Sequence, residues 1–138
     1  MKKRMITRRV VVPAVAALGI TALCAGVAAA TDSVTGTAVA GNGLNVRLAA
    51  NGSGSDLLNS PITAVIPYGS QVHITCTWLN DSVTGPWGST DVWDGIDYYV
   101  TPDNVTHDVG PDNLVSDAWV NTGGDTSQMG LRSCYAVG

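Results

Sequence analysis

Apolar and polar residues alternate along residues 71–78, and this stretch is the clearest element that the sequence predicts. Every second residue of it is apolar: Val72, Ile74, Cys76 and Trp78. A period of two is typical of a β-strand with one buried face. The pattern therefore predicts a strand that carries Cys76 toward the interior.

Other short runs of strand-forming residues are separated by clusters of turn-forming residues. We expect strands over 34–40, 44–48, 62–66, 90–93, 96–100 and 118–121. Glycine, serine, asparagine and aspartate dominate 51–56, and 101–113 is rich in the same types and proline, so both segments are predicted to be exposed loops. A turn-rich hairpin region is expected at 83–88. Many short strands between turns indicate a small barrel or sandwich.

The first thirty residues have the pattern of a secretory signal peptide. Basic residues precede an apolar, alanine-rich run over 10–30, and three alanines at 28–30 supply a small-residue cleavage site. We therefore expect 1–30 to be a signal peptide and the mature protein to be secreted, free or associated with a cell wall. The run is also long enough to span a bilayer, so an uncleaved membrane anchor is the alternative.

Composition strengthens the all-β expectation and limits the partners. Residues 31–138 contain no Glu, Lys or Phe, which removes the usual surface of a helix. They carry eleven aspartates against two arginines, a net charge of −9. Such a charge argues against binding to nucleic acid or to anionic lipid, because both require Lys and Arg.

Two cysteines remain beyond the signal segment, Cys76 and Cys134. An even number in an exported protein predicts one disulfide. That bond would tie an irregular C-terminal tail, 124–138, to the middle of the sheet.

Four short motifs follow one another along the chain. They are Gly-Leu-Asn-Val-Arg at 43–47, Ile-Pro-Tyr-Gly-Ser-Gln-Val at 66–72, Val-Thr-Gly-Pro-Trp-Gly-Ser-Thr-Asp-Val-Trp-Asp at 83–94 and Val-Ser-Asp-Ala-Trp-Val-Asn-Thr-Gly at 115–123. In this order they resemble the bacterial SH3-type domain of small secreted Gram-positive proteins. The resemblance implies an all-β fold, a small SH3-like barrel of short antiparallel strands with long loops, over residues 31–123.

The chain departs from that family pattern at three places, namely 48–50, Gly95 and the long segment 101–113. In the family these positions lie in loops that line the binding cleft. The resemblance therefore implies the fold and a binding role more strongly than it implies a particular ligand.

Aromatic side chains supply the candidate binding residues. Trp78, Trp93 and Trp119 lie in strand patterns and are expected in the core, whereas Trp87 lies in a predicted turn. Tyr98 and Tyr99 are adjacent, so one of them must face outward in a strand. Together with Asp94, which could meet an amino group, Trp87 and the outward tyrosine are the predicted ligand contacts.

Catalytic and metal chemistry find little support in the sequence. Asp91, Asp94 and Asp97 could contribute to a calcium site, but their spacing matches no calcium loop, and a solvated acidic surface is the simpler interpretation. His73 and His107 are too few for a zinc site. A cysteine–histidine nucleophilic pair would require a free thiol, and a two-carboxylate glycosidase site has no motif here. No cofactor is expected.

These observations favour a non-enzymatic, monomeric binding module that recognises cell-wall peptidoglycan, most plausibly its peptide part. The alternative is a free secreted interaction or inhibitor protein that acts on a partner protein, because the chain has one domain and no catalytic neighbour.

Overall fold

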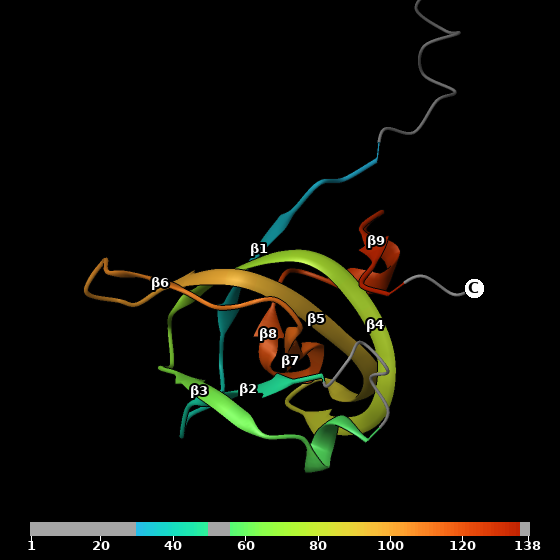
Figure 1. Ribbon diagram of the computed structural model, residues 1–138, viewed down its shortest axis with the longest axis horizontal. Coiled ribbons are helices and arrows are strands. Elements are labelled where there is room, and N and C mark those ends of the chain that lie inside the picture. Colours follow the sequence, from blue (N-terminus) through green and yellow to red (C-terminus); the bar gives the residue numbers. More distant parts are fainter. Residues whose placement is uncertain (1–29, 50–55, 136–138) are drawn as a thin grey trace, which may run out of the picture.

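The computed structural model describes residues 30–49 and 56–135, and in this part the chain is almost entirely β (Figure 1). The strands are β1 (Val34–Ala38), β2 (Leu44–Leu48), β3 (Ile62–Ile66), β4 (Gln71–Gly85), β5 (Gly88–Val100), β6 (Thr106–Asp108), β7 (Asn113–Ser116), β8 (Val120–Asn121) and β9 (Arg132–Ser133). Three single 3₁₀ turns interrupt them: η3 (Leu57–Asn59), η4 (Asp117–Trp119) and η5 (Thr126–Gln128). The all-β expectation is confirmed.

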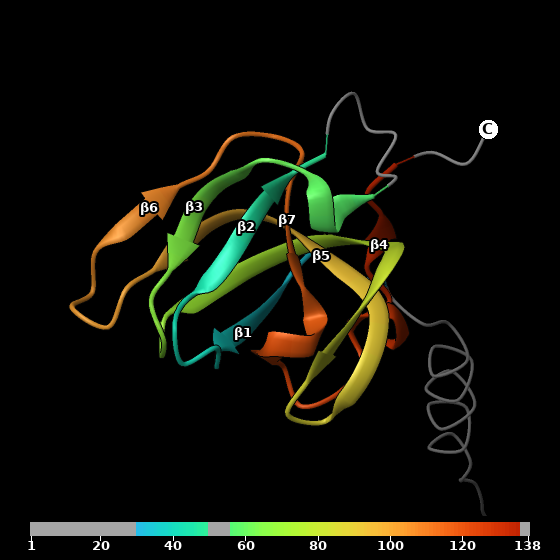
Figure 2. The same cartoon turned by 90° about the horizontal axis from the view of Figure 1, so that it is seen from below.

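The strands form one sheet in the order β3-β2-β7-β5-β4-β1-β8. In addition, β6 pairs with β5 and β9 pairs with β4. All pairings are antiparallel except β4 with β9. The sheet curls, so that β2 and β3 lie across β4 and β5 (Figure 2). It does not close on itself, because β3 and β8 remain its two ends. The expected small SH3-like barrel is therefore not confirmed.

The β4–β5 hairpin is the longest feature, and it exceeds the predicted strand at 71–78. Strand β4 continues to Gly85, turns at Pro86 and Trp87, and returns as β5. The register shifts between Leu79 and Val83 and at two earlier points. Such bulges bend a strand, which allows the hairpin to curve around the core (Figure 1).

Polar side chains at this bulge also position the η3 turn. Asn80 Oδ1 accepts a hydrogen bond of 2.9 Å from the Leu57 amide, and Asp81 Oδ2 accepts one of 3.0 Å from the Leu58 amide. These hydrogen bonds provide acceptors for the first amide groups of the turn, which have no acceptor within the turn itself. They fix Leu57, which is completely buried, in the interior.

The interior contains two apolar clusters. The larger lies between the two layers of the sheet and includes Val46, Ile66, Val72, Ile74 and Val115. The smaller contains Ala49, Leu57, Trp93 and Leu114. Trp93 is in the core as expected, whereas Trp78 and Trp119 are half-buried and pack against the edges of the smaller and larger cluster respectively.

The predicted disulfide between Cys76 and Cys134 is present and closes a loop of 58 residue steps. Loop-closure entropy assigns such a bond about 3 to 4.5 kcal/mol of stabilisation. Beside it, β9 pairs with β4 through Arg132 and Cys76. Thr126 in η5 is completely buried, so the segment after 123 packs into the same body as the sheet.

Two segments differ from their sequence-based expectation. The strand expected at 118–121 begins as the η4 turn, because Ser116 Oγ accepts the Ala118 amide at 3.2 Å and caps a 3₁₀ turn there. The expected loop 101–113 contains the short strand β6, which pairs with the end of β5. The expected signal peptide and most of the 51–56 loop lie outside the described residues. Within the described part, no helix is long and apolar enough to cross a membrane.

Candidate functional site

The predicted contact residues are not gathered in one place. Trp87 is at the hairpin tip that precedes β5 and is 64% exposed. Tyr98 and Tyr99 are at the other end of the same strand. Tyr98 is half-buried and stacks on His73 with ring centroids 4.5 Å apart, whereas Tyr99 is buried and stacks on His107. Tyr98 is therefore the more outward of the two tyrosines.

Asp94 was predicted as a ligand contact, and the structure places it in the interior. Its side chain is completely buried, and its backbone is paired with Thr77 on β4 and Val115 on β7. Five consecutive residues, Val92 to Ile96, are buried in this part of β5. The alternation of inward and outward residues is lost there: β4 and β7 pair with the two edges of the strand, and η4, η5 and the Cys76–Cys134 disulfide pack against it. A carboxyl in this position cannot touch a ligand at the surface.

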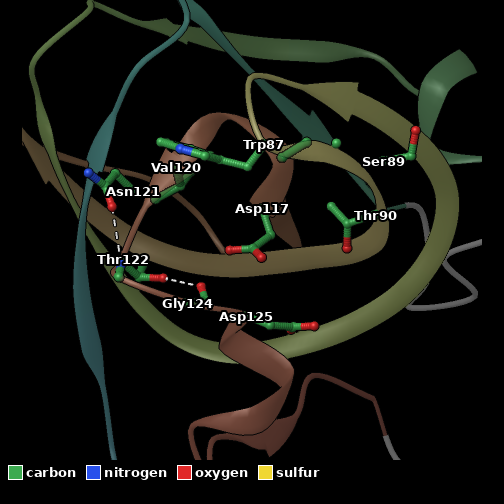
Figure 3. A pocket seen from close by; sticks show the side chains of 12 residues that line it. Trp87, Ser89, Thr90, Asp117, Val120, Asn121, Thr122, Gly124 and Asp125 are labelled. Carbon is green, nitrogen blue, oxygen red and sulfur yellow. Dashed lines mark hydrogen bonds between the residues drawn. The ribbon is translucent and has the colours of Figure 1, made fainter.

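A hollow of about 460 Å³ opens between the hairpin tip and residues 117–125 (Figure 3). Trp87 forms one wall, Asp117 lies in the middle, and Asp125 lies on the opposite side. Gly88, Ser89 and Thr90 of β5 complete one side of the hollow, and Val120 to Gly124 complete the other. We call this space the Trp87 hollow.

Asp117 connects the hollow to the buried Asp94. Both Asp94 Oδ2 and Asp117 Oδ1 are inaccessible to solvent, and no N–H or O–H group of another described residue reaches either atom. The two carboxyl groups interact with each other. A hydrogen bond between two carboxyls requires that one of them keep its proton. Asp94 is the more deeply buried of the two, so it is the carboxyl that keeps a proton more readily.

The electrostatics agree with that assignment. Burial raises the pKa of Asp94 well above its usual value and the Asp117 charge raises it further, while a hydrogen bond from Thr126 opposes the shift. Burial also raises the pKa of Asp117, although the hydrogen bond from Asp94 lowers it. Both shifts have the same largest cause, because a charged carboxylate is costly away from water.

The rim of the hollow is held by its own hydrogen bonds. Asn121 Oδ1 accepts the Gly123 amide at 3.1 Å, and Thr122 Oγ1 donates to the Gly124 carbonyl at 2.7 Å. Asp125 Oδ1 accepts from the amide and the hydroxyl of Ser127. The lining residues include an exposed indole and two carboxyl groups but no cationic side chain. This combination suits a ligand with a flat or apolar part and a positively charged or hydrogen-donating group.

Sequence reasoning missed Asp117. It follows Ser116 in the motif at 115–123, where a serine before an acidic residue is a signal for a capped turn. That signal predicts the turn, but only the packing of the hairpin against it shows that the carboxyl meets Asp94.

Other chemical groups lie apart from this hollow. His73 Nδ1 is 2.6 Å from Asp97 Oδ1 on the outer face of the sheet. Cys76 and Cys134 are joined to each other rather than available as thiols. In residues 30–49 and 56–135, no three His, Cys, Asp or Glu side chains are grouped so that they could share a metal ion.

Comparisons with known proteins give no further guide to identity: no family model, no curated protein and no solved structure matches the chain.

Proposed function

We propose that this chain is an exported, non-enzymatic binding protein with an SH3-type fold, and that it recognises the peptide part of cell-wall peptidoglycan through the Trp87 hollow. The observation that carries the proposal is a tryptophan 64% exposed beside a hollow with two carboxyl groups. Exposed tryptophans are rare on monomers and frequent in binding sites.

The four sequence motifs support the same interpretation. The motif at 83–94 forms the turn and flanking strands of the β4–β5 hairpin, and the motif at 115–123 spans η4 and β8. Together these two motifs supply nearly all of the residues that line the Trp87 hollow. Two of the four motifs therefore line the candidate site, whereas 48–50, Gly95 and 101–113, whose counterparts line the cleft in the family, do not contribute to it.

The charge of the chain limits the ligand further. Residues 31–138 carry −9, so anionic wall polymers would be repelled. A peptide with a free amino group would instead be attracted, with its ammonium near Asp117 or Asp125 and its backbone against Trp87. Stacking against the indole would persist at high salt, whereas the ammonium–carboxylate contact would weaken.

Co-sedimentation of the purified, disulfide-bonded protein with peptidoglycan tests the proposal. We expect saturable binding that Trp87→Ala weakens about ten-fold or more at any salt concentration. Asp117→Asn should weaken it mainly at low salt. Tyr68→Ala is the matched control, because Tyr68 is 61% exposed but does not line the hollow. A folded wild-type protein that stays in the supernatant, or equal losses for Trp87→Ala and Tyr68→Ala, would refute it.

One observation favours the second candidate, a secreted protein that acts on a partner protein. Strand β3 is an end of the sheet and contains no charged residue, while Ile62 and Val65 are 48% and 52% exposed. An uncharged, apolar sheet edge can pair with an extended segment of another protein. In pull-downs from culture supernatant, this function predicts a specific partner that binds the wild type and is lost with Val65→Lys, but not with Trp87→Ala.

A further inference from the structure

A second hollow, of about 280 Å³, lies where the turn between β1 and β2 meets η3, η4 and the β4–β5 hairpin. Its main walls are Trp93, Trp119, Leu58 and Val83, and Arg47 and Asn45 are among its polar groups. The η4 segment contributes to both hollows, with Asp117 lining the first and Trp119 lining the second. The two sites therefore share a turn but differ in charge.

Arg47 is the feature that distinguishes this second hollow. It is one of only two arginines in residues 31–138, and no lysine occurs there. Its guanidinium is half-buried and donates one hydrogen bond of 2.9 Å from Nη1 to the Ser60 carbonyl. All eleven aspartates lie in the described part of the chain, and none of them is within ion-pair distance of Arg47.

An arginine without a carboxylate partner is unexpected in so acidic a chain. A guanidinium presents five N–H donors in a planar fork that matches a carboxylate, and partial burial strengthens such a pair. Placing this group at the surface of a hollow leaves donors available to an anion from outside. We propose that the second hollow binds a carboxylate attached to an apolar body, with Arg47 as its charge partner.

The walls specify the rest of that ligand. Trp93 is held rigidly, since its indole Nε1 donates a 2.9 Å hydrogen bond to the Asp81 carbonyl. Trp119 packs against the main core and is half-buried. Trp93 is only 2% exposed and lies beneath the hollow, while Trp119, Leu58 and Val83 supply the accessible apolar surface beside one positive charge. This surface suits an acyl amino acid or the C-terminal residue of a peptide. This site is separate from the proposed function, which concerns the Trp87 hollow.

A pair of probes that differ only in charge tests the inference. N-acetyl-leucine and N-acetyl-leucinamide are titrated separately into the purified, disulfide-bonded protein, and the indole N–H signals of its four tryptophans are followed by NMR. We expect the Trp93 and Trp119 signals to move saturably with the acid, with a Kd on the order of 1 mM, as is typical of so small a ligand. The amide should bind at least about ten-fold more weakly, because it lacks the charge that Arg47 recognises.

Variants of the two arginines identify the group responsible. Arg47→Gln should bind acid and amide equally, whereas Arg47→Lys keeps a positive charge and should retain part of the preference. Arg132→Gln is the matched control, since it removes the same charge from β9 outside this hollow and should leave the preference unchanged. Thermal unfolding of each variant shows whether the loss of the Ser60 hydrogen bond has disturbed the fold.

The inference is overturned if wild-type protein shows no saturable shift, if acid and amide bind equally, or if Arg132→Gln removes the preference as fully as Arg47→Gln does. It is also overturned if Trp87 alone responds, because the acid would then be in the first hollow. If Arg47→Gln does not fold, Arg47→Lys takes its place in the test. The inference is refuted if acid and amide bind with equal Kd values in the wild type and in Arg47→Lys alike.

Discussion

Thr126 Oγ1 donates a hydrogen bond of 2.5 Å to Asp94 Oδ1, and both side chains are completely buried although they are 32 residues apart. This contact joins the segment after the last long strand to the centre of β5. The second carboxyl oxygen of Asp94 is buried without a hydrogen-bond partner among the described residues, and burial, followed by the charge of Asp117, raises the pKa of Asp94. Because the Asp117 side chain also lines the Trp87 hollow, the buried Asp94 carboxyl is linked both to the tail and to the candidate site.

Asp94→Asn should be more stable than the wild type at neutral pH. Burial, and then the Asp117 charge, raise the pKa of Asp94 in the folded protein. In the unfolded chain the pKa of an aspartate is about 3.9. The folded state therefore binds a proton that the unfolded state has released, so the contribution of Asp94 to stability is complete below about pH 4 and falls as the pH rises through the folded pKa. Asparagine keeps an acceptor for Thr126 and supplies a permanent donor to Asp117.

Urea unfolding between pH 4 and pH 8 checks this prediction. The advantage of Asp94→Asn should grow with pH, and the exposed Asp91→Asn serves as the control for a change of net charge. If the unfolding free energies of wild type and Asp94→Asn changed in parallel with pH, the assignment of a buried proton to Asp94 would be contradicted.

Thr126→Val should destabilise the protein by about 1–3 kcal/mol, because it removes a buried hydrogen bond while keeping the shape of the side chain. The bond from Thr126 lowers the pKa of Asp94, so its loss should raise that pKa further and extend the fall of stability to higher pH. Denaturant titrations at pH 5 and pH 8 measure both effects. Thr122→Val, which removes a solvent-accessible hydroxyl, should change stability by less than about 0.5 kcal/mol.

Gly95→Ala should destabilise the protein mainly when the disulfide is present. A Cβ atom at Gly95 would overlap the sulfur atoms of both Cys76 and Cys134. We expect a loss of about 1–3 kcal/mol from this overpacking, and a clearly smaller loss in a Cys76→Ala/Cys134→Ala background. A double-mutant cycle of unfolding free energies gives the coupling; equal losses in the two backgrounds would show that the sulfurs are not the cause.

Gly85→Ala should disturb both hollows at once. Its Cβ atom would overlap the backbone carbonyl of Ala118 in η4, so the turn that carries Asp117 and Trp119 would have to move. We expect a loss of stability of about 1–3 kcal/mol and weaker binding at both sites. Gly41→Ala, whose Cβ would meet no atom within 4 Å, is the stability control. Unchanged binding in a folded Gly85→Ala protein would show that the position of the η4 turn does not affect binding at either site.

Several elements could be predicted because their signal is local. Strands 44–48 and 62–66 coincide with β2 and β3, and the alternating segment 71–78 begins β4 where expected. Exposure of Trp87 followed from the turn residues Pro86 and Gly88 around it. In each case the side-chain period or a turn signal within a few residues carries the information.

The errors occur where distant segments meet. Residues 80–85 are mostly polar and end in glycine, yet the pairing of 83–85 with β5 continues the strand beyond the bulge. Asp94 belongs to a segment without alternation, and its burial depends on Val115 and Thr126, which lie more than twenty residues farther along the chain. No pattern within a short window specifies such contacts.

The sequence by itself determined the all-β class, the positions of β1, β2 and β3, the pairing of Cys76 with Cys134 and the strong negative charge, since composition, cysteine count and local period are sufficient for these. Only the tertiary structure decided that the sheet stays open, that Asp94 is hidden while Asp117 lines a hollow, and that Arg47 lies beside two tryptophans. The physical reason is that burial and charge pairing depend on which distant segments the sheet brings together. That choice minimises the free energy of the whole chain rather than that of any one segment.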